Sequence, residues 1–223
     1  MELNKEIIIT NQDIEKYQRF DLLQKKDLYK VSIDSLLLIE YVIRNIFNKP
    51  IKNEINVLDI GSGNGVLDII TCDILKNERI KFYGIEIQRS LYELSRENLK
   101  KFGLEKQIEF INMDINKYRK EQKLRFDVLI SNPPFYPKSE SLLSPNESNQ
   151  IAKFEIKLTI EQLFENSVGL LKDGGIFCFI NILKNYKIIS SLIKKFNFKI
   201  LNISKIKFFN QKETNKIICH LKK

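Results

Sequence analysis

Hydrophobic and polar positions follow two different periods along most of this chain. Short runs rich in Ile, Val, Leu and Phe predict five buried strands, at residues 56–60, 81–87, 108–113, 126–131 and 175–182. Apolar residues at i, i+3 and i+4 predict helices between them, at residues 66–75, 90–102 and 159–172, with another near 185–196. Strands that alternate with helices are typical of an α/β fold, in which a parallel sheet carries helices on both faces.

The two ends of the chain add further elements to this pattern. Two strands are predicted at residues 200–209 and 215–222, and the short polar segment between them predicts an antiparallel hairpin. Near the N-terminus, residues 13–24 resemble extended or hairpin structure, and residues 33–47 predict a helix with Asp34 or Ser35 near its start. We therefore expect a seven-stranded sheet, five parallel strands plus the C-terminal hairpin, in a domain of residues 55–223. An N-terminal extension of residues 1–54 is expected to pack on this domain.

Composition excludes several classes of protein. No apolar run approaches the ~20 residues that a membrane-spanning helix needs, and the first residues carry no leader pattern. The three cysteines (Cys72, Cys178 and Cys219) lie far apart in apolar surroundings, which is typical of reduced core thiols. With a single histidine, His220, no zinc or other metal site is expected. These features predict a cytoplasmic protein with no membrane partner, and we expect a monomer.

Charge is distributed unevenly. The whole chain carries a formal net charge of +9, and residues 181–223 contain eleven lysines and one acid, Glu213. This C-terminal part therefore carries +10, which leaves −1 for residues 1–180. A basic segment on a nearly neutral body predicts an anionic partner, most plausibly nucleic acid, although a solvated lysine-rich surface is the alternative.

A glycine-rich turn connects the first predicted strand to the helix that follows it. The stretch DIGSGNG has glycine at alternate positions, which lets a ligand approach the backbone and the helix N-terminus closely. Acids end the next two strands, where a carboxylate can accept hydrogen bonds from ribose hydroxyls or an adenine amine. The candidate cofactor-binding residues are Asp59, Gly61, Gly63, Gly65, Glu86 and Asp114.

The fourth strand ends abruptly at Asn132-Pro133-Pro134-Phe135. The two prolines fix two φ angles and remove two backbone donors, and the first of them keeps Asn132 out of the helical region. An amide and an aromatic ring are thereby held side by side at the end of a core strand. We take these four residues as the candidate catalytic group.

Together, the glycine turn, the two later acids and the Asn-Pro-Pro-Phe stretch resemble class I S-adenosylmethionine-dependent methyltransferases over roughly residues 55–222. The resemblance implies S-adenosylmethionine as cofactor, with the glycine turn beside its methionine part, Asp59 supporting that turn and Glu86 on the ribose. It implies that Asp114 reads the adenine of the cofactor. The target would be an amine conjugated to a ring or a carbonyl, and its two N–H groups would donate to the Asn132 side-chain oxygen and the Pro133 carbonyl. Phe135 would stack on the planar substrate.

Residues 22–42 and 151–175 resemble more narrowly the bacterial tRNA(Val) adenine-N6 methyltransferases, which modify position 37 beside the anticodon. This implies methylation of an adenine amine in tRNA, and we expect tRNA phosphates to contact Lys153, Lys205, Lys207, Lys212 and Lys216. Lys153-Phe154 departs from the Arg-His of that family. Asp34 matches a family position and could equally cap its helix or face the cofactor. The alternatives are methylation of another RNA or of a protein glutamine, or a non-catalytic RNA-binding protein that binds the cofactor.

Overall fold

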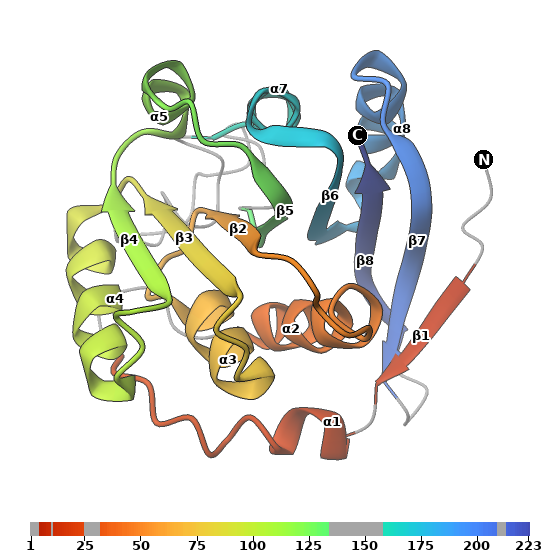
Figure 1. Ribbon diagram of the computed structural model, residues 1–223. Coiled ribbons are helices and arrows are strands. Elements are labelled where there is room, and N and C mark those ends of the chain that lie inside the picture. The colour runs from red at the N-terminus through yellow and green to blue at the C-terminus, as the bar shows by residue number, and fades with distance from the viewer. Residues whose placement is uncertain (1–4, 10, 25–31, 134–157, 209–212) are drawn as a thin grey trace, which may run out of the picture.

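The computed structural model describes residues 5–9, 11–24, 32–133, 158–208 and 213–223. Their strands form one sheet in the order β1-β7-β8-β6-β5-β2-β3-β4 (Figure 1). The strands are β1 (Lys5–Ile9), β2 (Ile55–Ile60), β3 (Ile80–Glu86), β4 (Ile108–Asn112), β5 (Phe126–Ser131), β6 (Leu171–Ile182), β7 (Lys199–Phe208) and β8 (Glu213–Lys222). The helices are α1 (Asn11–Glu15), α2 (Ile33–Asn45), α3 (Val66–Leu75), α4 (Arg89–Phe102), α5 (Ile115–Glu121), α7 (Ile160–Leu170), the 3₁₀ turn η2 (Leu183–Asn185) and α8 (Tyr186–Lys195).

The predicted seven-stranded core is confirmed. Strands β2 to β6 run parallel, and β8 lies antiparallel between β6 and β7. β6 begins at Leu171, four residues earlier than expected, and its register with β5 shifts between Phe126 and Val128. β1 was not expected. This strand adds an eighth member to the described sheet, parallel to β7 at the edge.

Two hydrophobic layers cover the sheet, one on each face. Side chains of α2, α3 and α4 pack on one face with alternate residues of the central strands, such as Cys178 and Ile180 of β6. Side chains of α5, α7 and α8 pack on the other face with the intervening residues, such as Phe177 and Phe179. Burial of one such side chain stabilises the fold by about 1.5–3 kcal/mol. The period-2 alternation of β6 thus fixes which residues face which helices.

Helix ends follow local chemistry. Ser32 caps α2, and its hydroxyl accepts from the backbone N–H of Ser35. Thr159 and Gln162 form a capping box at the start of α7. Gly103 ends α4 in the left-handed conformation, which glycine adopts without steric cost. The short helix α5, capped by Asp114, was not expected, because its seven residues are too few to show a clear period.

The expectation of extended or hairpin structure at residues 13–24 was wrong. α1 covers the start of this segment, and no strand is assigned within residues 11–24. Tyr17 is buried and its hydroxyl donates to the buried carboxylate of Glu40 on α2. Leu23 exchanges backbone hydrogen bonds with the side chain of Asn98 on α4, at 2.7 and 3.3 Å. The Asn98 side chain thus satisfies the backbone N–H and carbonyl of Leu23, which would otherwise bond to a neighbouring strand in a sheet.

Candidate active site

The glycine turn after β2 adopts a conformation that requires glycine. Gly61, Gly63 and Gly65 have φ angles of +79°, +57° and +82°. The backbone N–H groups of Gly61 and Ser62 donate to the carbonyl of Ile85 at 2.9 and 3.1 Å, which holds the turn against the end of β3. A Cβ atom on Gly61 or Gly63 would meet nothing within 4 Å, whereas on Gly65 it would lie 2.6 Å from the Phe110 ring. The first two glycines therefore leave bare backbone facing open space, and the third permits close packing.

Glu86 lies at the end of β3 beside this turn. Its Oε2 accepts from the N–H of Gly63 at 2.9 Å, and its Oε1 accepts from the N–H of Gln88 at 2.7 Å. Burial raises the pKa of Glu86, against the opposing effect of the backbone N–H groups of Gln88, Gly63 and Ile87. Each carboxylate oxygen retains further acceptor capacity, so Glu86 can hold the turn and still accept from ligand hydroxyls.

Asp59 lies beneath the same turn, next to a second buried acid. Asp59 at the end of β2 and Asp68 in the first turn of α3 are both 0% exposed. Among the described residues, no hydrogen-bond donor reaches the carboxylate oxygens of either residue. Burial raises the pKa of both carboxyl groups, and the nearby charges of Asp68 and Glu86 raise that of Asp59 further. The raised pKa values favour the protonated carboxyl groups in the cofactor-free protein, and a cationic ligand group nearby would favour their ionised forms.

Asp114 follows β4 and serves as the N-cap of α5. Its Oδ1 accepts from the backbone N–H groups of Asn116 and Lys117 at 2.8 and 3.2 Å. The second oxygen of Asp114 takes no part in these two bonds. The residue also lines a small pocket with a cavity volume of about 50 Å³ at the carboxyl ends of β2, β3 and β4. The pocket residues are Ile60, Gly61, Ile85, Glu86, Ile87, Met113, Asp114, Ile115 and Leu158.

These features fit S-adenosylmethionine, the cofactor that the sequence motifs imply. The pocket combines apolar walls for a purine ring with two acids for its polar edge and a ribose. The bare glycine backbone leads from that pocket toward the start of α3. The unpartnered carboxylate of Asp59 lies where a cationic amino group would be stabilised. The six candidate cofactor residues are thus brought to one edge of the sheet, and their individual roles stay predictions.

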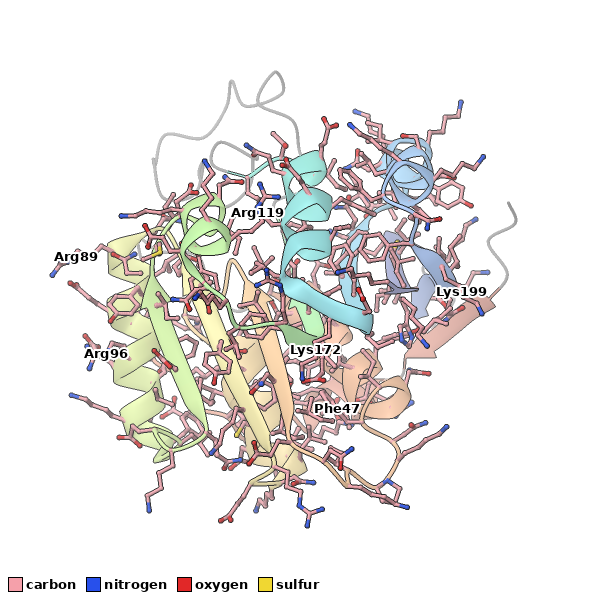
Figure 2. The ribbon with its side chains drawn as sticks, turned by 45° about the horizontal axis from the view of Figure 1, so that its top comes forward. Phe47, Arg89, Arg96, Arg119, Lys172 and Lys199 are labelled. Atoms are coloured by element: carbon pink, nitrogen blue, oxygen red, sulfur yellow. The ribbon has the colours of Figure 1, made fainter. Side chains whose placement is uncertain are left out.

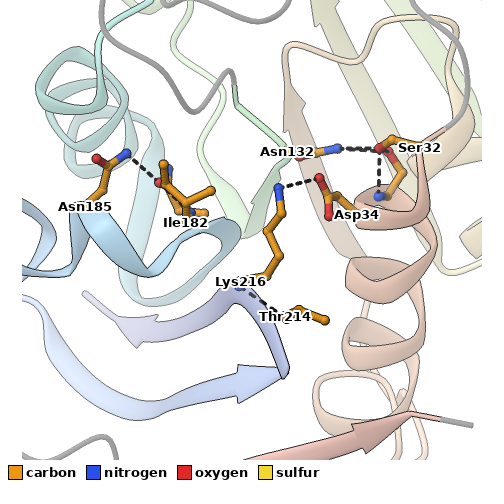
Figure 3. Close-up of polar contacts among 9 residues, drawn as sticks. Ser32, Asp34, Asn132, Ile182, Asn185, Thr214 and Lys216 are labelled. Atoms are coloured by element: carbon orange, nitrogen blue, oxygen red, sulfur yellow. Dashed lines mark hydrogen bonds and ion pairs between the residues drawn. The ribbon is translucent and has the colours of Figure 1, made fainter. Parts of the chain in front are cut away.

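Asn132 lies at the end of β5 and is oriented by two serines. Its Nδ2 donates to the hydroxyl of Ser35 at 2.9 Å and to that of Ser32 at 3.3 Å (Figure 3). The end of β5 is tied to β2, because the hydroxyl of Ser131 donates to the carbonyl of Ile60 at 2.8 Å. Pro133 is buried. The other two candidate catalytic residues, Pro134 and Phe135, lie outside the described residues.

Neither expected role of Asp34 is the one that the structure displays. Ser32 caps α2, and Asp34 forms an ion pair with Lys216 of β8, with Nζ and Oδ2 2.8 Å apart (Figure 3). The side chains of Lys216 and Asp34 are only 17% and 12% exposed. Lys216 therefore already holds a carboxylate on α2, close to Asn132 and the helix turn that carries Ser35. Its expected contact with tRNA phosphate stays a prediction.

The other candidate substrate lysines are distributed over the hairpin and beyond. Lys205 and Lys207 lie on β7 with half-buried side chains. Lys153 and Lys212 lie outside the described residues. Basic side chains also occur far from the hairpin, where Arg89 and Arg96 of α4 point outward (Figure 2). Arg89 is paired with Glu93 on the same helix, which reduces its net contribution to a basic surface.

Sequence reasoning missed four residues that support the site. Ser32 and Ser35 contact Asn132 across 97 to 100 positions, and no local signal could have paired them. Asn98 donates to the carbonyl of Asn64 at 3.1 Å and so supports the glycine turn from α4. Asp68 did have a signal, because it is an acid within an otherwise apolar helical stretch.

The single histidine and the three cysteines are buried in the protein core. His220 of β8 is buried, and its Nδ1 lies 3.1 Å from the hydroxyl of Tyr41 on α2. Burial lowers the pKa of His220. Cys72, Cys178 and Cys219 are buried free thiols, as expected.

Comparison with known proteins identifies the family of this chain. A family described as "Methyltransferase domain" matches residues 51–221. The chain belongs to this methyltransferase family. The methyltransferase shares the seven-stranded order and terminal hairpin of class I enzymes, and S-adenosylmethionine is the cofactor of this domain.

Among curated proteins, the methyltransferase is similar to enzymes named tRNA1(Val) (adenine(37)-N6)-methyltransferase. The protein from Flavobacterium johnsoniae is 26% identical over 192 residues, which cover 86% of this chain and 77% of the relative. That from Proteus mirabilis is 27% identical over 165 residues, which cover 74% and 61%.

Solved structures share the fold at low identity. TrmN from Thermus thermophilus aligns with a TM-score of 0.58 and 18% identity, over 85% of this chain and 48% of that one. The 16S rRNA N2 G1207 methyltransferase (RsmC) from T. thermophilus aligns with a TM-score of 0.60 and 20% identity, over 87% and 44%. A putative RNA methyltransferase from Pyrococcus horikoshii aligns with a TM-score of 0.63 and 15% identity, over 96% and 98%. These likenesses concern the fold.

Among the described residues, no helix is long and apolar enough to cross a membrane. Within the same part of the chain, no group of three or more His, Cys, Asp or Glu side chains could hold a metal ion.

Proposed function

We propose that this methyltransferase transfers a methyl group to the exocyclic amine, N6, of an adenine in tRNA, at position 37 beside the anticodon. The observation that carries the proposal is the fixed amide of Asn132 at the end of β5, near the cofactor edge of the sheet. The names of the similar curated proteins support tRNA and position 37 as the substrate. The lysine-rich C-terminal part supports a nucleic-acid partner, which the enzyme would meet in the cytoplasm.

The chemistry depends on how the amine is held. The lone pair of an adenine amine is delocalised into the ring, so the nitrogen is a weak nucleophile. The two N–H groups of the amine would donate to Asn132 Oδ1 and the Pro133 carbonyl, which turns the lone pair out of the ring plane. Both acceptors also stabilise the positive charge that develops on the nitrogen as the new N–C bond forms. Fixed orientation of this kind contributes about 7–11 kcal/mol in favourable cases.

When bound, S-adenosylmethionine would supply an electrophilic methyl group on a sulfonium. Transfer to the nitrogen would leave the electron pair of the broken bond on sulfur, and the nitrogen would then lose one proton to solvent. No strong base is needed before transfer, because the amine attacks as a neutral nucleophile. Asn132 and Pro133 therefore act by hydrogen bonding and position, while Glu86 and Asp114 are proposed to fix the ribose and adenine of the cofactor.

Position 37 lies in a single-stranded loop, where bases can be turned outward and stacked on aromatic rings. We propose Phe135 as the ring that stacks on the target adenine, which is worth about 1–3 kcal/mol per base. Phe135 lies outside the described residues, so this role follows from its place directly after Pro133-Pro134. Lys153, Lys205, Lys207 and Lys212 are proposed to contact phosphates.

The test is methylation of tRNA from a strain that lacks the position-37 modification, with labelled cofactor, followed by digestion and mass spectrometry. We expect N6-methyladenosine in one tRNA species. Label in ribosomal RNA or on protein glutamine would keep the chemistry and overturn tRNA as the substrate. Cofactor binding without any methylated product would overturn the catalytic proposal in favour of a non-catalytic RNA-binding protein.

A further inference from the structure

The amide of Asn132 must point in one direction to serve its proposed role. Its oxygen accepts hydrogen bonds and its nitrogen donates them, and the two ends have almost the same shape. Rotation by 180° would direct N–H groups at the N–H groups of the target amine, and these donors would repel each other. The protein must therefore hold the amide in the productive orientation before the substrate arrives.

The first turn of α2 supplies partners for the nitrogen end. Ser35 Oγ accepts from Nδ2 at 2.9 Å, and Ser32 Oγ lies 3.3 Å from the same nitrogen. The two hydroxyl oxygens are 3.2 Å apart, close enough for one to donate to the other. Both N–H groups of the amide can thus be satisfied on the helix side, which leaves Oδ1 as the group that Asn132 offers to a ligand.

This support is rigid for three reasons. Ser35 is 2% exposed, so its hydroxyl has little freedom to move. Ser32 is also the helix cap and accepts from the backbone N–H of Ser35, which fixes the two hydroxyls relative to each other. The ion pair between Asp34 and Lys216 ties the same turn to β8. The turn is therefore held from the helix, from the sheet and from the end of β5.

We propose that Ser35, assisted by Ser32, is a positioning residue that orients the Asn132 amide and so selects a target group that donates hydrogen bonds. This inference rests on the proposed function and deepens it. An exocyclic amine fits an acceptor-only Asn132, whereas a ring carbonyl at the same place would face the Asn132 oxygen and be repelled. Residues 32–35 precede the region that matches the methyltransferase family, so the N-terminal extension completes the target side of the site.

The test compares Ser35→Ala with Ser35→Thr and with a matched control. Ser167→Ala removes an equally buried helical hydroxyl on α7, where it donates to the Leu163 carbonyl. We expect Ser35→Ala to lower kcat about 10- to 100-fold, since a misplaced catalytic group of this kind can cost about 10²-fold. Cofactor Kd is expected to change by less than about twofold, Ser35→Thr to recover most of the turnover, and Ser167→Ala to leave kcat unchanged. Wild-type turnover in Ser35→Ala would overturn the proposal.

A measurement that needs no substrate separates this inference from the proposed function. The side-chain ¹⁵N–¹H₂ signals of Asn132 are assigned as the pair that disappears in Asn132→Asp. We expect their exchange with water to accelerate at least tenfold in Ser35→Ala and to stay unchanged in Ser167→Ala. Signals that do not respond would show that Ser35 does not hold the amide and would overturn the inference. A wild-type protein inactive on tRNA but with responsive amide signals would overturn the tRNA substrate alone and support the orientation by Ser35.

Discussion

The cofactor edge and the target side of this methyltransferase are built in different ways. The cofactor edge consists of acids and glycines at the ends of consecutive strands β2, β3 and β4, and its contacts join neighbouring turns, as between Gly63 and Glu86. The target side joins segments from all parts of the chain. Asn132 meets Ser35 across 97 positions, and Asp34 meets Lys216 across 182.

The two regions also differ in charge. Three buried acids, Asp59, Asp68 and Glu86, lie at the cofactor edge, and burial raises the pKa of each. On the target side, the buried acid Asp34 is paired with Lys216. A cationic ligand group would therefore favour ionisation of the acids at the cofactor edge, whereas the Asp34 carboxylate on the target side already has a partner within the protein. Variants of each region should therefore have separable effects on cofactor affinity and on turnover.

Asn132→Ala is expected to separate turnover from cofactor affinity most clearly. Loss of one hydrogen-bonding group that stabilises developing charge typically reduces kcat about 10²- to 10³-fold. Cofactor Kd should stay within about twofold of the wild type, because Asn132 is not among the residues that line the cofactor pocket. Single-turnover assays and calorimetric titration measure the two quantities. A parallel loss of cofactor affinity would argue that the two regions are coupled.

Gly65→Ala is expected to damage the cofactor edge most. Its φ of +82° costs an alanine about 1–2 kcal/mol, and overlap with the Phe110 ring adds about 1–3 kcal/mol. Gly103→Ala is the matched control, with a φ of +66° but open space around the added methyl group. Urea unfolding of both variants should show a clearly larger loss of stability in Gly65→Ala. Equal losses would mean that the Phe110 contact relaxes without penalty.

Glu86→Gln should weaken cofactor binding about tenfold or more. Both carboxylate oxygens accept backbone N–H groups, and the amide nitrogen of glutamine would oppose one of these donors. A hydrogen bond to a charged group is worth about 1.5–3 kcal/mol. Glu93→Gln, an exposed change on the adjacent helix α4, serves as the control in calorimetric titration. Unaltered affinity in Glu86→Gln would remove Glu86 from the proposed ribose site.

Lys205→Ala and Lys207→Ala should weaken tRNA binding in a salt-dependent way. Each lost phosphate contact is expected to reduce the slope of log K against log salt by about 1. Filter-binding titrations over a range of salt concentrations measure the slope. Lys172→Ala, at the start of β6 and paired with Asp127, is the control (Figure 2). Unchanged slopes would place the tRNA phosphates elsewhere on the molecule.

The smallest effect is a pH dependence of stability in the cofactor-free protein. Because burial raises the pKa of Asp59 and Asp68 in the folded state, the unfolded chain gives up its protons first as pH rises. The free energy of unfolding should therefore fall as pH rises above the ordinary carboxylate range near 4 toward the raised pKa values. Asp68→Asn should flatten this decline, and the exposed change Glu78→Gln should not. Urea unfolding between pH 5 and pH 9 provides the measurement.

The same contrast explains what the sequence could predict. Strand and helix periods predicted β2 to β8, because each strand shows its own alternation or apolar run. The motifs could be grouped into one candidate cofactor site from the sequence, because parallel strands bring their carboxyl ends to one edge of the sheet. β1 was missed because only five residues pair at the edge of the sheet, and residues 13–24 were misread because side chains of Glu40 and Asn98 replace strand partners. Ser35 was noted only as a possible helix start, since its contact with Asn132 exists only in the folded chain.

The place of β8 has a consequence for synthesis of the protein. β8 follows the other seven described strands in the chain, yet it lies between β6 and β7 and carries the lysine that holds Asp34. As the chain leaves the ribosome, β7 and its neighbour β1 cannot join the hydrogen-bond ladder of the central strands until β8 emerges between β7 and β6. Contacts across such long separations form slowly, because the chain must first lose the entropy of closing large loops. The cofactor edge can thus assemble during translation, while the ion pair that holds Asp34 forms only after β8 has been made.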